Sequence, residues 1–176
     1  MSRKTSWPSV LGDERADFEF REATAGDGPA IRAVVFSVLD EYGLRPDTAG
    51  TDKDLENVVS SYVVRGGCFQ VVVSKTSEVV GCGGLYPLDA GDAEIRKMYL
   101  LPVARGRGLG RALLKFLIFA ARERGFERVF VETASVLKEA ISLYRANGFV
   151  PFTRERLARR CDQAYVLHLS DVASAP

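Results

Sequence analysis

The segment from Tyr99 to Phe126, YLLPVARGRGLGRALLKFLIFAARERGF, constrains the fold most, because the period of its apolar residues changes within a few positions. A short apolar run ends at Pro102, and three glycines then alternate with basic and apolar residues. Beyond the glycines, apolar residues follow helical spacing at Leu109, Leu113 and Leu117. The pattern predicts a strand, a glycine-rich turn and an amphipathic helix, which Gly125 ends.

Patterns elsewhere in the chain predict further helices and strands. Strands are expected at 18–23, 68–74, 79–88, 93–101, 127–133 and 163–170, and helices within 24–42 and at 55–64 and 138–147. Several of these strands run consecutively, and the second half adds a strand–turn–helix–strand unit. The predicted fold class is therefore α+β.

The size and composition of the chain indicate one domain. It has 176 residues, of which 47% are hydrophobic, which suffices for one core but is short for two domains. We expect a folded domain over 18–170, with a flexible arm at 1–17 and a flexible tail at 171–176, because both ends are polar and lack a period. The net charge of +1, with acids and bases interspersed, argues against a nucleic-acid partner.

Cysteine, histidine and apolar content exclude further classes. The three cysteines stand far apart without a CxxC pair, and the single histidine has no partner at ligand spacing, so neither a metal site nor a disulfide framework is expected. No segment approaches about eighteen uninterrupted apolar residues, and the first residues lack the apolar region of a signal peptide. These features predict a cytoplasmic protein with reduced thiols and no membrane partner.

The turn from Arg105 to Arg111 has the chemistry of an anion-binding site. Backbone N–H groups at a helix start lack helical partners, and the helix dipole is positive there. Glycines let a phosphate approach those groups, while arginines add charged planar donors. Neither a P-loop nor a GxGxxG dinucleotide motif fits the register of these glycines. A plainer alternative, a tight turn with solvated arginines, stays open.

Two motifs in the second half resemble those of the GNAT N-acetyltransferase superfamily. RGRGLG, at 105–110, is similar to the family's R/Q-x-x-G-x-G/A signature. AISLYRANGFVPF resembles a second signature, A-x-x-L-Y-x-x-x-G-F, whose residues here are Ala140, Leu143, Tyr144, Gly148 and Phe149. The two motifs occur in the expected order, with a predicted helix and strand between them.

The resemblance implies a GNAT-like fold, with a mixed central sheet splayed between its fourth and fifth strands and flanked by helices. It implies acetyl-CoA as co-substrate, with no metal, between the strand holding Met98 and the strand holding Phe130. The cofactor-binding residues that it implies are Met98, Tyr99, Leu100, Arg105, Gly106, Arg107, Gly108, Leu109, Gly110 and Arg111. One position departs from the family, because Leu137 stands where many members carry asparagine, which leaves contacts with the pantetheine arm there to the backbone.

Glu94 and Tyr144 are the catalytic residues that the resemblance implies. Glu94 begins the strand that runs to the glycine turn, where family members often place a general base, and it shares side-chain parity with Met98 and Leu100 if no bulge intervenes. Tyr144 resembles the tyrosine that faces the departing sulfur. Plainer roles stay open for both: a glutamate paired with a neighbouring basic residue, and a core tyrosine.

Two weaker clusters bear on the acceptor. Asp47, Asp52 and Asp54 could steer a cationic amine, or they could serve as caps and turn formers. The run at 154–160 contains four arginines, Arg154, Arg156, Arg159 and Arg160, which could hold a carboxylate or phosphate or could face solvent. Together the clusters favour a small amino-bearing metabolite.

The implied function is transfer of an acetyl group from acetyl-CoA to a primary amine, by direct attack in a ternary complex. The alternative is a non-catalytic acyl-CoA-binding sensor or interaction module with the same fold. A homodimer is a further expectation, because members of the family are often dimers.

Overall fold

The computed structural model describes residues 17–89 and 91–170. The predicted tail at 171–176, and all of the predicted arm at 1–17 except Asp17, lie outside the described residues. The strands are β1 (Phe18–Glu22), β2 (Cys68–Ser74), β3 (Val79–Pro87), β4 (Asp92–Leu100), β5 (Arg128–Thr133), β6 (Val150–Pro151) and β7 (Gln163–His168). The α-helices are α1 (Gly28–Glu41), α2 (Leu109–Glu123) and α3 (Lys138–Ala146).

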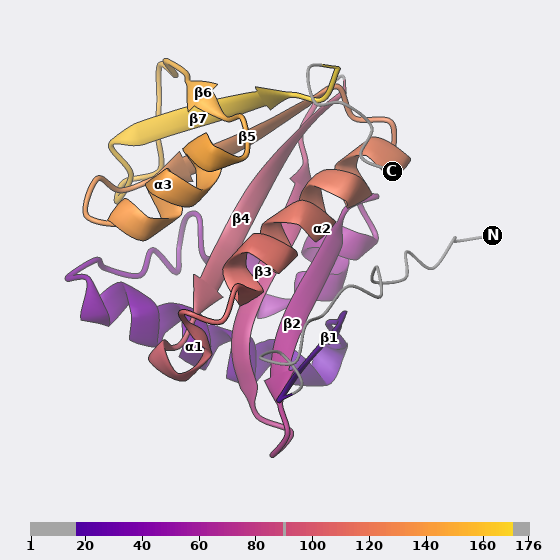
Figure 1. Cartoon of the computed structure of the whole chain (residues 1–176), viewed down its shortest axis with the longest axis vertical. Coiled ribbons are helices and arrows are strands. Elements are labelled where there is room, and N and C mark those ends of the chain that lie inside the picture. Colours follow the sequence, from indigo (N-terminus) through magenta and orange to yellow (C-terminus); the bar gives the residue numbers. More distant parts are fainter. Residues whose placement is uncertain (1–16, 90, 171–176) are drawn as a thin grey trace.

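The strands form one mixed sheet in the order β1-β2-β3-β4-β5-β7-β6 (Figure 1). All neighbours are antiparallel except β4 and β5, which are parallel. The β4–β5 ladder covers only Asp92–Ile95 against Arg128–Val131, although β4 continues to Leu100 and β5 to Thr133. The two strands therefore separate toward their C-terminal ends, which confirms the predicted α+β class and the splay between the fourth and fifth strands.

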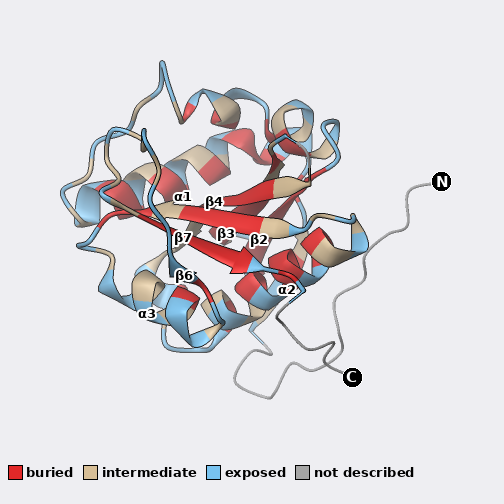
Figure 2. Cartoon of the chain, turned by 90° about the horizontal axis from the view of Figure 1, so that it is seen from above, coloured by how far each residue is buried: buried red, intermediate tan, exposed pale blue. Residues whose placement is uncertain are grey.

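Helices cover both faces of the sheet, and each face has its own apolar cluster (Figures 1 and 2). On the α2 side, Leu109, Leu113 and Leu117 of α2 are at most 1% exposed. Burial of each such side chain contributes roughly 1.5–3 kcal/mol, so the predicted stripe holds α2 on the sheet. On the other side, α1 packs Ile31 and Val35, both 0% exposed, against β2 and β3.

Two local features differ from the sequence prediction. The helix expected at 55–64 is instead two short turns, a 3-10 turn at Lys53–Glu56 and a π-helical turn at Val59–Val63. Asn57 separates them because its backbone is extended and its side chain accepts a hydrogen bond from the N–H of Ser60 at 3.0 Å. The two-residue edge strand β6 was not predicted, because two residues carry no period.

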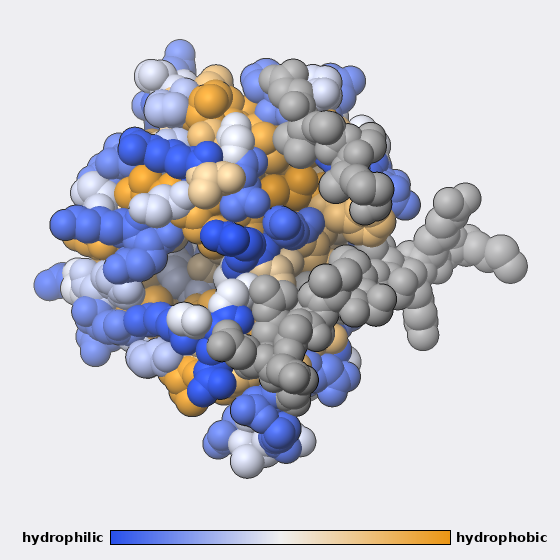
Figure 3. All heavy atoms as spheres, in the orientation of Figure 1, coloured by the Kyte–Doolittle hydropathy of each residue, from blue (hydrophilic) through white to orange (hydrophobic). Residues whose placement is uncertain are grey.

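The surface is mixed in character. In the space-filling view of the α2 face, hydrophilic side chains alternate with apolar ones (Figure 3). Among the described residues, no helix is long and apolar enough to cross a membrane.

Candidate active site

The separation of β4 and β5 creates two adjoining hollows. A groove of about 510 Å³ runs past the turn between β4 and α2, and a cavity of about 340 Å³ lies between the separated strands. We call them the groove and the cavity. Four residues line both, namely Met98, Tyr99, Leu137 and Ala140, so the two hollows meet beside the end of β4.

The groove collects nearly all of the residues predicted to bind a cofactor. Its lining includes Met98, Tyr99, Leu100, Arg105, Gly106, Gly108, Leu109, Gly110 and Arg111. Arg107 is not part of the lining. Its guanidinium lies 5.4 Å from the ring centroid of Phe18 and 4.0 Å from a carboxylate oxygen of Asp17. The structure therefore brings nine of the ten predicted residues together and directs the tenth elsewhere.

The turn presents backbone donors to the groove. Within the described part of the chain, the N–H groups of Gly106, Gly108, Leu109, Gly110 and Arg111 make no hydrogen bond, and the first helical bond of α2 runs from Ala112 to Gly108 at 3.1 Å. Gly106 and Gly108 have φ of +74° and +70°, a region that other residues enter only with strain. The glycines thus give the turn a shape that leaves consecutive N–H groups available to an anion.

Arg105 braces the turn. Its Nε donates to the carbonyl oxygen of Leu100 at 2.9 Å, and its two terminal nitrogens donate to the carboxylate of Glu41 at 2.6 and 2.7 Å. Glu41 ends α1, so this pair ties the turn to a second element. The side-chain hydrogen bond from Arg105 lowers the pKa of Glu41 below its usual range, partly offset by desolvation.

A β-bulge in β4 changes which residues share a face. Gly84 pairs with Arg96 whereas Cys82 pairs with Tyr99, so β4 has one extra residue between these pairs. Lys97 lies in the bulge with φ of +56°. An extra residue reverses side-chain alternation. The predicted parity is therefore wrong: Glu94 shares its face with Tyr99, while Met98 and Leu100 pack on the α2 side.

Glu94 lies on the wall of the cavity and is deeply buried, with a side chain that is 8% exposed. Its Oε2 accepts hydrogen bonds from Arg96 at 3.1 Å and from Arg154 at 3.4 Å. The first contact is the neighbouring basic pair that the plainer interpretation anticipated. The second comes from the segment between β6 and β7 and could not be read from strand spacing. Two guanidinium groups therefore hold the Glu94 side chain in place on the cavity wall.

Tyr144 lines the same cavity from α3. Its ring packs 5.7 Å from that of Phe149, and the residue is 5% exposed. Burial raises the pKa of the hydroxyl above its usual range, and Tyr99 and Cys161 add to the shift. Within the described residues the hydroxyl makes no hydrogen bond. Tyr144 is thus both a core residue and a protonated donor on the cavity wall.

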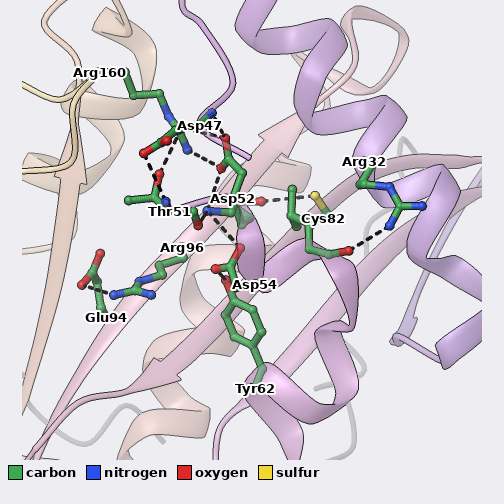
Figure 4. Close-up of polar contacts among 12 residues, drawn as sticks. Arg32, Asp47, Thr51, Asp52, Asp54, Tyr62, Cys82, Glu94, Arg96 and Arg160 are labelled. Atoms are coloured by element: carbon green, nitrogen blue, oxygen red, sulfur yellow. Dashed lines mark hydrogen bonds and ion pairs between the residues drawn. The ribbon is translucent and has the colours of Figure 1, made fainter. Parts of the chain in front are cut away.

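A buried charge network supports the bulge, and sequence reasoning missed it. The ammonium of Lys97, 3% exposed, donates to the carbonyl of Thr51 at 2.7 Å and lies 3.0 Å from Asp52 and 3.3 Å from Asp54. Figure 4 shows Thr51, Asp52 and Asp54 together with Arg160. Arg160 donates to both carboxylate oxygens of Asp52, at 2.7 and 2.8 Å. Burial opposes ionisation of Asp52, but Arg160, the Asp47 N–H and Lys97 outweigh it and lower the pKa to about 2.

The network bears on the two roles left open for the aspartates, steering of a cationic amine and capping or turn formation, because their carboxylates have internal partners. Asp52 and Asp54 neutralise Lys97 and Arg160, and Asp54 also accepts a hydrogen bond from Tyr62 at 2.5 Å. Asp47 is a turn former, because its carboxylate accepts from the Thr51 N–H at 3.2 Å. The only sequence signal for the network was the close spacing of the aspartates, which does not reveal their partners.

Cys82 and Cys161 are not activated as nucleophiles. Burial raises the pKa of the Cys82 thiol to about 12 and that of the Cys161 thiol to about 11, so both stay protonated at neutral pH. Over 17–89 and 91–170, no group of three or more His, Cys, Asp or Glu side chains is arranged to hold a metal ion.

A mixed sheet that opens at its one parallel pair, beside a glycine turn with unpaired N–H groups, is the architecture of the GNAT class. The chain belongs to this class: the model of the Acetyltransferase (GNAT) family matches residues 36–149. It is 42% identical over 134 residues to the uncharacterized N-acetyltransferase YjgM of Escherichia coli (strain K12), covering 73% of this chain and 80% of that protein.

More distant relatives agree with this assignment. The human N-acetyltransferase 8B is 29% identical over 137 residues, covering 69% of this chain and 60% of that protein. Among solved structures, a GNAT acetyltransferase from Staphylococcus aureus Mu50 aligns with a TM-score of 0.81 at 22% identity, covering 86% and 99% of the two chains. The Salmonella typhimurium protein yncA, solved with its cofactor acetyl-CoA, aligns with a TM-score of 0.68 at 23% identity, covering 90% and 97%. At such identities the structures demonstrate the shared fold.

Proposed function

We propose that the protein transfers an acetyl group from acetyl-CoA to the primary amine of a small molecule, by direct attack in a ternary complex. The observation that carries the proposal is a set of backbone N–H groups, those of Gly106, Gly108, Leu109, Gly110 and Arg111, that make no hydrogen bond within the described residues. They lie on a groove that leads into the cavity lined by Glu94 and Tyr144. The presence of acetyl-CoA in yncA, a protein of the same fold, supports the choice of cofactor.

The residues of the groove fit acetyl-CoA. Gly106, Gly108, Leu109, Gly110 and Arg111 would hold the diphosphate through their N–H groups, where the positive end of the α2 dipole adds to binding. The apolar walls from Leu100, Leu109 and Leu143 suit the pantetheine arm, and Leu137 offers no side-chain hydrogen bond to it. When bound, acetyl-CoA supplies the acetyl group as an activated thioester.

Glu94 would take the proton that the amine gives up. The ordinary pKa values of a carboxylic acid and an alkylammonium ion differ by roughly 6 units, or about 8 kcal/mol, so direct abstraction of a proton from an alkylammonium ion by a carboxylate is strongly uphill. Arg96 and Arg154 each donate a hydrogen bond to Glu94 and so fix the position of its carboxyl group. We therefore propose that the neutral form of the amine attacks the thioester carbon. Glu94 positions this amine, accepts the proton that its nitrogen loses as the amide forms and the thiolate departs, and then passes that proton to solvent.

Tyr144 would assist departure of the sulfur. Its raised pKa keeps the hydroxyl protonated, and that hydroxyl has no partner among the described residues, so it is available to donate a hydrogen bond to the thiolate that forms as the carbon–sulfur bond breaks. Full proton transfer from a tyrosine to a thiolate is uphill by about 2 kcal/mol even at ordinary pKa values. Tyr144 therefore acts as a hydrogen-bond donor.

An amine panel with acetyl-CoA tests the proposal. Release of free thiol and a product heavier by one acetyl group are expected with at least one small primary amine. Calorimetry with acetyl-CoA runs in parallel. Binding of acetyl-CoA without thiol release above buffer would instead identify a non-catalytic acyl-CoA sensor, and absence of binding would remove both interpretations.

A further inference from the structure

Two arginines flank Glu94 in the cavity, each lying over an aromatic ring. Tyr86, Glu94 and Phe130 form one row across β3, β4 and β5, because Glu94 pairs with Tyr86 on one side and with Phe130 on the other. The guanidinium of Arg96 lies 3.8 Å from the Tyr86 ring centroid, and that of Arg154 lies 4.9 Å from the Phe130 ring centroid. We call Arg96 and Arg154 the arginine pair.

The arginine pair keeps most of its donors unused. Arg96 donates through one nitrogen, Nη2, and Arg154 donates through one nitrogen, Nη1, to Glu94 and to Glu132. Within the described residues the remaining guanidinium nitrogens of both side chains make no hydrogen bond. Each guanidinium carries five N–H donors, and both residues line the cavity. Several charged donors are therefore available there.

The arginine pair is also held in place before any ligand binds. Glu132 accepts from Arg154 at 2.5 Å and, through its other oxygen, from the backbone N–H of Ala158 at 2.8 Å, which ties the segment after β6 to β5. Arg96 is fixed by Tyr86 and Glu94. A preorganised, planar guanidinium loses little freedom when it binds a carboxylate.

The other two cationic side chains that line the cavity, Arg160 and Lys97, differ from the arginine pair because buried groups of the protein occupy their main donors. Arg160 uses both terminal nitrogens on Asp52 (Figure 4), and Lys97 is surrounded by Thr51, Asp52 and Asp54. Arg96 and Arg154 are also paired, with Glu94 and Glu132, but each of them keeps guanidinium nitrogens that make no hydrogen bond within the described residues. The arginine pair is thus the cationic feature suited to an external anion.

We propose that the arginine pair binds the carboxylate of the acceptor, and that the acceptor is a small molecule bearing both an amine and a carboxylate, such as an amino acid. This assignment rests on the proposed function and names its substrate class. The positive, negative, positive order of Arg96, Glu94 and Arg154 complements such a molecule, with its carboxylate on a guanidinium and its ammonium beside Glu94. A cavity of about 340 Å³ accommodates a molecule of this size.

The test compares acceptors that differ only at the carboxylate. Free amino acids and the matching amino acid amides are assayed with acetyl-CoA across the common side chains. We expect kcat/KM for the best free amino acid to exceed that of its amide by about 10- to 100-fold, as expected for charge-assisted hydrogen bonds. Equal or better turnover of the amides would overturn the proposal.

Variants assign the effect to the arginine pair. Arg154→Gln and Arg96→Gln should each raise KM for the free amino acid at least about tenfold while changing KM for its amide by less than about threefold. Arg156→Gln, an exposed arginine on the same segment, is the matched control and should retain the preference. Circular dichroism and acetyl-CoA affinity establish that each variant is folded.

The outcomes separate this inference from the proposed function. A preference that survives both arginine substitutions would overturn the assignment to the pair, as would an equal KM increase for free and amidated acceptors. If no amine is acetylated while acetyl-CoA still binds, the proposed function itself fails, and the acceptor class fails with it.

Discussion

The groove and the cavity are built in different ways, although they meet at the end of β4. The groove owes its chemistry to consecutive backbone N–H groups between residues 106 and 111, shaped by glycines with positive φ. The cavity owes its chemistry to side chains from β4, β5, the segment around Thr51 and the segment at 154–161. Backbone recognition is encoded by a short local motif, whereas side-chain recognition depends on tertiary contacts between distant segments.

The largest expected effect is a loss of stability on substitution of Asp52, which tests the side-chain contacts that build the cavity. Asp52 is 3% exposed and is the shared partner of Lys97 and Arg160. Asp52→Asn removes the carboxylate that pairs with Arg160 and one of the two that pair with Lys97, and removal of one member of a buried ion pair typically costs about 3 kcal/mol or more. We expect a loss of about 3 kcal/mol in the free energy of unfolding, measured by urea denaturation. Asp40→Asn, at an exposed position of α1, is the control and should change it by less than about 0.5 kcal/mol.

The same substitution should change the pH dependence of stability. The pKa of Asp52 is lowered to about 2 in the folded protein, against about 3.9 unfolded. A depressed pKa contributes stability that is fully present above about pH 4 and is lost as the pH falls toward about 2. The wild-type free energy of unfolding should therefore fall more steeply between about pH 4 and pH 2 than that of Asp52→Asn. Parallel curves in this window would contradict the role of the carboxylate.

Gly110→Glu tests the proposed binding of the diphosphate by backbone N–H groups in the groove. Gly110 lies in the first turn of α2, where a new Cβ would meet Leu100 and Leu143 at the ordinary contact distances of 3.5 and 3.7 Å. A glutamate there favours the helix through propensity and dipole but repels a diphosphate. At an effective dielectric of about 20, one charge at about 4 Å amounts to about 4 kcal/mol, so acetyl-CoA affinity should fall at least about 100-fold in calorimetry.

Gly110→Gln separates charge from bulk in that experiment. Glutamine has nearly the same size as glutamate and carries no charge, so its affinity loss should be much smaller. Equal losses in the two variants would show that space, and not anion binding, limits the site. Undiminished affinity in Gly110→Glu would contradict the placement of the diphosphate.

The sequence predicted the groove well and the cavity poorly, and the contrast above explains why. The glycine turn and the apolar stripe of α2 follow from local periodicity, and the splayed sheet follows from the family resemblance that the contiguous motifs carry. The bulge at Lys97 does not, because a lysine carries no preference for positive φ and its stabilising partners lie more than forty residues away, at Thr51, Asp52 and Asp54. Likewise, Arg154 reaches Glu94 only because β5 and the segment after β6 fold over the cavity.

Tyr144→Phe tests the proposed hydrogen-bond donor on the cavity wall. The hydroxyl makes no hydrogen bond to a described residue, so its removal should leave the thermal midpoint nearly unchanged. Loss of one hydrogen bond to the departing thiolate should lower kcat about tenfold, with KM for acetyl-CoA unchanged. Stopped-time thiol assays at saturating acceptor measure kcat directly. An unchanged kcat would leave Tyr144 with its packing role alone.

Arg107→Gln is expected to have the smallest effect, on the Kd for acetyl-CoA. It tests which arginines of the glycine turn contribute to binding. Sequence resemblance includes Arg107 among the cofactor-binding residues, but its guanidinium is directed toward Phe18 and Asp17, while Arg105 lines the groove. Exposed charges at a distance are screened and contribute little, so Arg107→Gln should change the acetyl-CoA Kd by less than about twofold. Arg105→Gln should weaken binding up to about fivefold, because the turn loses its ties to Leu100 and Glu41. A larger effect at Arg107 than at Arg105 would mean that Arg107 contacts the cofactor, as the motif implies. The turn would then have to adopt a different arrangement when acetyl-CoA binds.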